Sequence, residues 1–178
     1  MFNDDRLANY PLRQSLLPGA ERLPIFATRG LVDWLSRPDR YLVVCEGRGG
    51  RIYAADECFL EEAQAVILDA HGACIVMRKP EVLTYIDPEI NGWVEPVMFL
   101  RIKSPHAHAR DILVELRRRE ARILEMDMQR HDVVVRAEGR LEDLMGLARV
   151  LCSFARGSVS IWTWLERYEP AKTESPRL

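Results

Sequence analysis

The chain of 178 residues contains 48% hydrophobic and 29% charged residues, and its formal net charge at pH 7 is -2. This balance is typical of a folded globular protein and argues against a disordered tail. It also lacks the overall basic excess that marks many nucleic-acid-binding proteins. The length fits two small domains.

The first 24 residues predict an extended arm, because Pro11, Pro18 and Pro24 interrupt them and no hydrophobic period is sustained. Acidic residues lie close to Met1, at Asp4 and Asp5, and no apolar stretch has the length of a signal peptide. No stretch approaches the roughly 18 apolar residues of a membrane span. We therefore expect a cytoplasmic protein with no membrane segment.

Residues 25 to 90 predict a small α+β unit. Its expected elements are a helix over 28–36, a hairpin over 41–55, a helix over 59–70, two short strands around Pro80 and a linker over 87–92. Gly47, Gly49 and Gly50 connect two strands, and no Lys-Ser or Lys-Thr pair follows them. They therefore predict a turn and not a phosphate-binding loop, so no GTP site is expected.

Cysteine and histidine spacing predicts neither a disulfide framework nor a metal site. The four cysteines lack a CxxC spacing and have apolar neighbours, so we expect reduced, small hydrophobic side chains at Cys45, Cys58, Cys74 and Cys152. His106 and His108 form an HxH pair without a third ligand at a convincing spacing. No cofactor is predicted.

Residues 91 to 170 predict a second α+β domain, and a flexible tail is expected over 171–178. The expected elements are strands over 94–105, 121–128, 132–140 and 158–168, and helices over 107–119 and 141–155. Helical spacing in the second helix predicts an inner face made of Leu141, Leu144, Met145, Ala148, Cys152 and Ala155. The order βαββαβ predicts a ferredoxin-like sandwich.

Several motifs in this half occur in one order. They are Glu-Pro at 95–96, Ser-Pro at 104–105, DILVELRRREARILEM from Asp111, VVRAEGRLEDLMGLARVLCSFARGS from Val134, and RYEP at 167–170. Together they resemble the C-terminal domain of elongation factor G and its tetracycline-resistance relatives, over residues 93 to 170 only. The resemblance implies a ferredoxin-like fold and contact with the factor-binding region of the ribosome or another RNA-protein target. The chain shows no motif for reading guanine or hydrolysing GTP.

The chain also departs from the family's pattern. A family Tyr and Thr become Leu147 and Arg149, and an Arg-Ser-x-Thr run becomes Cys152 to Ala155. A Gln-Gly-Arg loop becomes Arg156, Gly157 and Ser158. These changes predict that the surface that family members use in translation has changed in this chain.

The 4-1-3-2 strand order of a ferredoxin-like sheet leaves one face without helices. Strand alternation places six side chains on this face, namely Phe99, Arg101, Lys103, Arg136, Trp162 and Trp164. Aromatic rings beside cations could stack RNA bases and follow phosphates. The same rings could instead be covered by residues 1 to 90, or contact a protein partner or a second copy of the chain.

Two further surfaces have alternative interpretations. Arg117, Arg118, Arg119 and Arg122 end a helix and could contact rRNA phosphates, or could stabilise the helix C-terminus among acidic neighbours. A stripe of Leu147, Val150 and Phe154 predicts contact with another domain or subunit.

The sequence contains no paired nucleophile and base, so no enzyme is predicted. Asp56, Glu57, Glu61 and Glu62 lie at or near a helix start, where carboxylates usually cap the helix. The leading hypothesis is a non-catalytic binding protein associated with the ribosome or RNA. The alternatives are a protein-interaction or regulatory module and, more weakly, a sensor or enzyme with a pocket between the two units.

Overall fold

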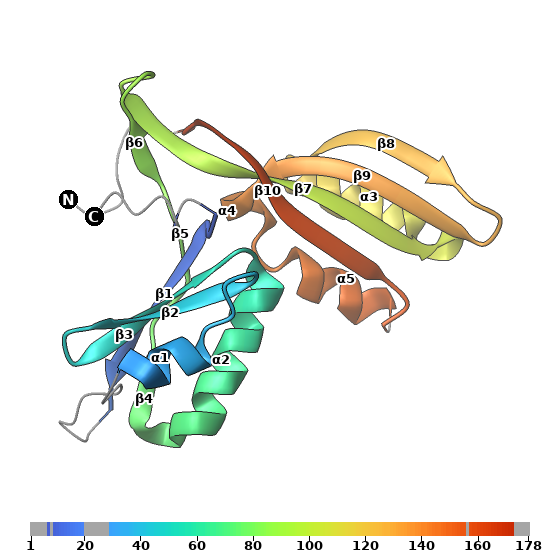
Figure 1. The fold of residues 1–178 in the computed structure, drawn as a ribbon. Helices are drawn as coiled ribbons and strands as arrows, with labels where there is room; N and C mark the ends of the chain where they lie inside the picture. Colours follow the sequence, from blue (N-terminus) through green and yellow to red (C-terminus); the bar gives the residue numbers. More distant parts are fainter. Residues whose placement is uncertain (1–6, 8, 20–28, 156, 173–178) are drawn as a thin grey trace. The chain divides into compact units, whose positions relative to one another are not determined.

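The computed structural model describes residues 7, 9–19, 29–155 and 157–172 (Figure 1). The chain divides into two compact units, Met1–Leu83 and Thr84–Leu178. The predicted arm over 1–24 and tail over 171–178 therefore lie partly outside the described residues. Each unit is an α+β fold with its own antiparallel sheet.

The first unit has the element order βαββαβ. Its elements are β1 Leu12–Pro18, α1 Arg29–Leu35, β2 Tyr41–Glu46, β3 Gly49–Ala54, α2 Glu57–His71 and β4 Ile75–Met77, with a short β5 Glu81–Val82. The sheet order is β2-β3-β1-β4, and β5 also pairs with β1. This is the 4-1-3-2 arrangement of a ferredoxin-like sheet, where the sequence predicted only a small α+β unit.

The segment Leu12–Pro18, predicted as part of an extended arm, is a strand between β3 and β4. Leu12, Gln14 and Leu16 are buried, so the strand alternates even though one inward position is polar. The Gln14 side chain donates to the Arg78 carbonyl over 2.7 Å and accepts from Gln64 of α2 over 2.9 Å. These hydrogen bonds satisfy the buried amide.

The second unit begins with a hairpin and continues as a second βαββαβ fold. Its elements are β6 Tyr85–Asp87, β7 Gly92–Pro105, α3 Ala109–Arg118, β8 Arg122–Met128, β9 Asp132–Arg140, α4 Leu141–Leu144, α5 Leu147–Ala155 and β10 Ser160–Pro170. The sheet order is β10-β7-β9-β8, which confirms the predicted ferredoxin-like sandwich. Because β6 pairs with β7, residues 87–92, predicted as a linker, form the turn of this hairpin.

One face of the second sheet forms a hydrophobic core with the helices. Met98, Leu100 and Ile102 of β7 are buried, as are Ile112 and Leu116 of α3. In Figure 1 α3 lies behind the second sheet, and it contacts β8. Period-2 alternation then leaves the opposite face of β7 without a helix, and this open face carries the predicted site.

The predicted helix over 141–155 is broken into α4 and α5 at Met145 and Gly146. Gly146 has φ of +81°, a left-handed conformation that ends α4. The break shifts the helical phase, so that α5 buries Leu147, Leu151 and Ala155. Ala148 is only partly buried and Cys152 is exposed, contrary to the predicted inner face.

The four cysteines are free, as expected, but they are exposed, which differs from the apolar surroundings that the sequence predicted for them. None of them forms a disulfide in the part of the chain that the structure describes. No described helix is both long and apolar enough to cross a membrane.

Candidate functional site

The sheet register brings the six predicted side chains together on the open face of the second unit. Trp162 lies opposite Arg101, and Arg101 lies opposite Arg136. In the next row Trp164 lies opposite Phe99, which in turn lies opposite Glu138. Lys103 lies between Ser160 and Val134 in the row on the other side. We call this set of six residues the aromatic-basic face.

The aromatic rings of this face pack against side chains of β7. The rings of Phe99 and Trp164 stack with centroids 4.5 Å apart and an interplanar angle of 19°. The Arg101 guanidinium carbon lies 5.2 Å from the centroid of the Trp162 ring, a cation–π distance. Trp162 and Trp164 nevertheless remain 45% and 44% exposed, so both rings have surface available to a ligand.

The three cations of this face differ in their ionic partners. Lys103 pairs with Asp132 over 3.1 Å, and Arg136 pairs with Glu125 over 2.6 Å. Among the described residues, no carboxylate pairs with Arg101, which is exposed. Arg101 is therefore the cation of the face with the least neutralised charge.

Two β-bulges add residues to the open face that strand alternation alone would not place there. The β10–β7 register shifts between Leu165 and Arg167, and the β8–β9 register shifts between Ile123 and Glu125. The first bulge puts Arg167 opposite Val97, in line with Trp164. The second leaves Arg122 opposite Glu138 and Glu125 opposite Arg136.

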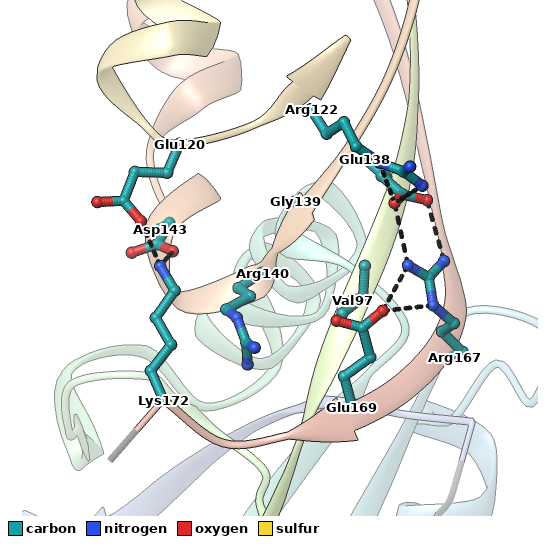
Figure 2. A pocket seen from close by; sticks show the side chains of 10 residues that line it. All are labelled: Val97, Glu120, Arg122, Glu138, Gly139, Arg140, Asp143, Arg167, Glu169 and Lys172. Atoms are coloured by element: carbon teal, nitrogen blue, oxygen red, sulfur yellow. Dashed lines mark hydrogen bonds and ion pairs between the residues drawn. The ribbon is translucent and has the colours of Figure 1, made fainter. Parts of the chain in front are cut away.

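A cavity of about 390 Å³ lies at the end of the open face beyond Trp164 (Figure 2). At its centre, Arg167 reaches across β7 to Glu138 with N–O distances of 2.9 and 3.0 Å. Arg122 donates to the same carboxylate from β8 through Nε over 2.8 Å. Hydrogen bonds from Arg167 and then Arg122 lower the pKa of Glu138 to about 2, against the opposing effect of burial.

The remaining cavity residues are also paired. Arg140 bonds to Glu95 and to the Pro170 carbonyl, and Lys172 bonds to Glu120 and Asp143. The lining therefore has four cations, Arg122, Arg140, Arg167 and Lys172, and four carboxylates, Glu120, Glu138, Asp143 and Glu169. Since these charges balance, the cavity has no net charge to attract an anion, and its ion pairs hold the strand ends together.

The predicted basic helix end consists mainly of internal ion pairs. Arg118 and Arg119 both bond to Glu115, and these bonds lower the pKa of that carboxyl. The Arg119 side chain, 12% exposed, also donates to the Asp143 and Met145 carbonyls. Arg122 belongs to the cavity, which leaves Arg117 as an exposed cation without an ion pair among the described residues.

The predicted interface stripe is reduced to two residues. Leu147 is 3% exposed, so this prediction was wrong: the break at Gly146 turns the residue to the buried face of α5. Val150 and Phe154 are partly exposed, and the Phe154 ring lies 6.0 Å from the His108 ring.

The histidine and carboxylate candidates have structural roles. His106 Nε2 lies 2.7 Å from the Gln129 carbonyl and 2.9 Å from that of Asp132, at the β8–β9 turn. Asp56 caps α2 by accepting from the Phe59 backbone N–H over 2.8 Å. Glu62 pairs with Arg40 over 2.9 Å. The described residues include no group of three side chains that could hold a metal ion.

Comparisons with known proteins agree with this fold. Residues 93–177 match the family described as "Elongation factor G C-terminus". Elongation factor G of Granulibacter bethesdensis is 29% identical over 77 residues, which are 43% of this chain and 11% of that protein. The chain thus spans about a tenth of the length of this relative.

A solved structure is similar over most of the chain. It is the crystal structure of ttk003000868 from Thermus thermophilus, with a TM-score of 0.62 and 12% identity, and it matches 92% of this chain and 41% of that one. Residues 93–178 are less than half of the chain, so this similarity of fold extends into the first unit. At this identity the similarity concerns the fold alone.

Proposed function

We propose that this chain is a non-catalytic, RNA-binding protein of the translation apparatus, because residues 93–177 are an elongation factor G C-terminal-like domain. Its target is ribosomal RNA, which it meets in the cytoplasm through the aromatic-basic face of its second sheet. The family supplies the link to translation. The choice of face rests on the arrangement of Arg101 and Trp162.

The exposed pair of Arg101 and Trp162 carries the proposal. Arg101 lies over the Trp162 ring and has no carboxylate partner among the described residues, so its charge can meet a phosphate. The exposed part of the Trp162 ring can stack a base, an interaction worth about 1–3 kcal/mol. Trp164, two residues along the same strand, offers a second ring.

The other two basic surfaces are less suited to RNA. At the helix end, Arg118 and Arg119 already bond to Glu115. In the cavity, each cation has a carboxylate partner and the lining charges balance. A phosphate would have to break these ion pairs before it could bind, whereas Arg101 has no such pair to break.

Ribosome co-sedimentation at low and high salt tests the proposal. We expect a ribosome-bound fraction at low salt that falls as salt rises, because phosphate contacts release counterions. Arg101→Ala should weaken binding several-fold, while Arg110→Ala, which removes an exposed cation from α3, should leave it unchanged. Absence of a bound fraction at every salt concentration would contradict the proposal.

A protein partner is the second candidate, and the composition of the same face favours it. Trp, Phe and Arg are enriched in protein interfaces relative to the rest of the protein surface. Here Arg101 lies opposite Arg136, whose ion pair with the exposed Glu125 could form part of a polar rim. Recovery of one stoichiometric protein complex from RNase-treated lysate, together with no ribosome binding, would favour this candidate.

A further inference from the structure

The sheet of the first unit exposes two neighbouring aliphatic side chains on the face opposite α2. Gln64 of α2 bonds to Gln14 of β1, and Leu16 on the same side of that strand is buried, so α2 packs on this side. Strand alternation puts Leu17 on the other face, where it is 37% exposed. Val76 of β4 lies opposite Leu17 in the register and is 50% exposed. The two side chains form the apolar centre of this face.

Two unpaired cations border these aliphatic side chains. Arg78 lies two residues after Val76 and continues the pairing with β1 through a backbone hydrogen bond of 2.9 Å, so it shares the face of Val76. Arg48 lies in the turn from β2 to β3, directly before Gly49, which lies against the backbone of Leu17. Both arginines are exposed, and neither has an ion pair among the described residues. We call Leu17, Arg48, Val76 and Arg78 the basic-aliphatic face.

The basic-aliphatic face has an excess of positive charge, and the aromatic ring beside it is buried. The other charged strand residues on this side of the sheet are already paired, Arg13 with Glu81 and Arg51 with Glu46. The charges of Arg48 and Arg78 are therefore not neutralised. Tyr53, on the same side, is only 6% exposed and cannot stack a base. The face is thus suited to a protein segment with carboxylates and aliphatic side chains, and less suited to RNA.

The hairpin of β6 and β7 in the second unit has the complementary composition. Tyr85, Ile86 and Ile90 are 43%, 57% and 50% exposed. Glu89, in the turn, is exposed, and its carboxylate has no ion pair within the part of the chain that the structure describes. The Glu89 backbone N–H donates to the Asp87 side chain over 2.8 Å, which fixes the turn. The hairpin therefore presents exposed apolar side chains beside an unpaired carboxylate.

We propose that the β6–β7 hairpin of one copy of the chain docks on the basic-aliphatic face of a second copy. Ile90 then packs against Leu17 and Val76, and Glu89 pairs with Arg78. Charge and hydrophobicity both match, because each surface combines unpaired charge of one sign with exposed aliphatic side chains. When each copy gives its hairpin to the other, the contact forms twice and closes as a two-fold pair.

The hairpin fits this face better than two other acidic surfaces of the chain. Asp33 precedes the exposed Trp34 of α1, and Asp69 follows the exposed Leu68 of α2. Each of these carboxylates adjoins one large exposed apolar side chain in the sequence, whereas residues 85–90 include three. Exposed apolar side chains that lie together mark interaction sites, while single ones are ordinary on a protein surface.

The pairing goes beyond the proposed function and does not depend on it. It uses no residue of the aromatic-basic face, so Trp162 and Trp164 stay available to RNA bases. Self-association is measured without RNA, and Arg101→Ala should leave it unchanged. Failure of either proposal therefore leaves the other to be judged on its own result.

Sedimentation velocity of the purified full chain over a wide concentration range is the first test. We expect the mass of two chains at high concentration and a return to one chain on dilution. The association should weaken as salt rises, because exposed charges contribute to it. A single-chain mass at every concentration would overturn the proposal.

Exchange of one charge pair identifies the two surfaces. Arg78→Glu and Glu89→Arg should each weaken the association about tenfold or more, because like charges then face each other. A chain that carries both changes should regain the association, since opposite charges meet again across the interface. An equal mixture of the two single variants should also form pairs, because each copy supplies the charge that the other lacks.

Asp69→Arg is the matched control for these variants. It makes the same change of charge as Glu89→Arg on an exposed position of α2 and should leave the association intact. An equal loss in Asp69→Arg and Glu89→Arg would assign the effect to net charge and overturn the hairpin contact. Association that both single variants leave unchanged, or that neither the double variant nor the mixture restores, would overturn it as well.

Discussion

The Trp164 ring stacks on the Phe99 ring across β10 and β7, with centroids 4.5 Å apart and an interplanar angle of 19°. The stack occupies one side of the indole and fixes its orientation on the open face. A ring that is already oriented loses little side-chain entropy when a base or another ring packs on it. The stack thus has a structural role and prepares the face for binding.

Removing the Phe99 ring should destabilise the second unit and loosen Trp164. We expect Phe99→Ala to lower the free energy of unfolding by about 1–3 kcal/mol, less than for a fully buried ring because Phe99 is partly exposed. A double-mutant cycle with Trp164→Ala should give a coupling of about 0.5–1.5 kcal/mol. Urea denaturation measures both, and zero coupling would mean that the stack adds nothing to stability.

Glu138 should make the stability of the second unit depend on acid pH. Its pKa is lowered from an ordinary 4.5 to about 2 by Arg167 and Arg122. A carboxyl with a lowered folded-state pKa contributes its stability above the unfolded-state value, and the contribution is lost as pH falls from about 4.5 towards 2. We expect Glu138→Gln to flatten the pH dependence in this window.

At neutral pH, Glu138→Gln should also cost about 1–3 kcal/mol, because two arginines lose a charged acceptor. Glu166→Gln, at the exposed bulge of β10, is the matched control and should change stability little. Thermal unfolding as a function of pH compares the two. Equal curves for the two variants would argue against the ion-pair network as a stabilising feature.

Arg119 should matter for folding much more than its neighbour Arg118. The Arg119 guanidinium bonds to Glu115 and to the carbonyls of Asp143 and Met145, where α4 ends. The Arg118 side chain is 66% exposed and, within the part of the chain that the structure describes, bonds to Glu115 alone. We expect Arg119→Ala to cost about 1–3 kcal/mol and Arg118→Ala at most about 1 kcal/mol in urea denaturation. Equal costs would contradict the bridging role of Arg119.

Gly146 should be sensitive to any side chain with a Cβ atom. At φ of +81° we expect Gly146→Ala to destabilise the chain by about 1–2 kcal/mol, although the added Cβ would meet no atom within 4 Å. Gly146→Asn should cost less, because Asn tolerates the left-handed region better. Thermal melts of the two variants provide the comparison. A neutral Gly146→Ala would show that the break between α4 and α5 is not set by this residue.

The sequence predicts the second unit well because its strands alternate cleanly and its motifs occur in one order. Alternation alone places Phe99, Arg101 and Trp162 on one face, as the register of β7 and β10 shows. It predicts neither the ion pairs that neutralise Lys103 and Arg136 nor the bulge that brings Arg167 to the same face. Those features depend on which residues meet across the sheet.

The sequence pattern failed to predict two parts of the fold, the strand β1 and the break between α4 and α5, and each failure has a physical reason. The strand β1 contains a buried Gln14, so its apolar alternation is incomplete in the sequence. The helical pattern over 141–155 continues through Gly146, and a lone glycine does not reveal whether it adopts a positive φ. The same break moved Leu147 from a predicted interface into the core.

The most direct test of RNA binding through the open face is the salt dependence of affinity for single-stranded ribosomal RNA. We expect binding at low salt. In a plot of log affinity against log salt concentration, the slope for Arg101→Ala should be shallower by about 0.7, the value for one lost phosphate contact. Tryptophan fluorescence should be quenched on binding, as stacked bases cover Trp162 and Trp164. An unchanged affinity and slope for Arg101→Ala would contradict the account.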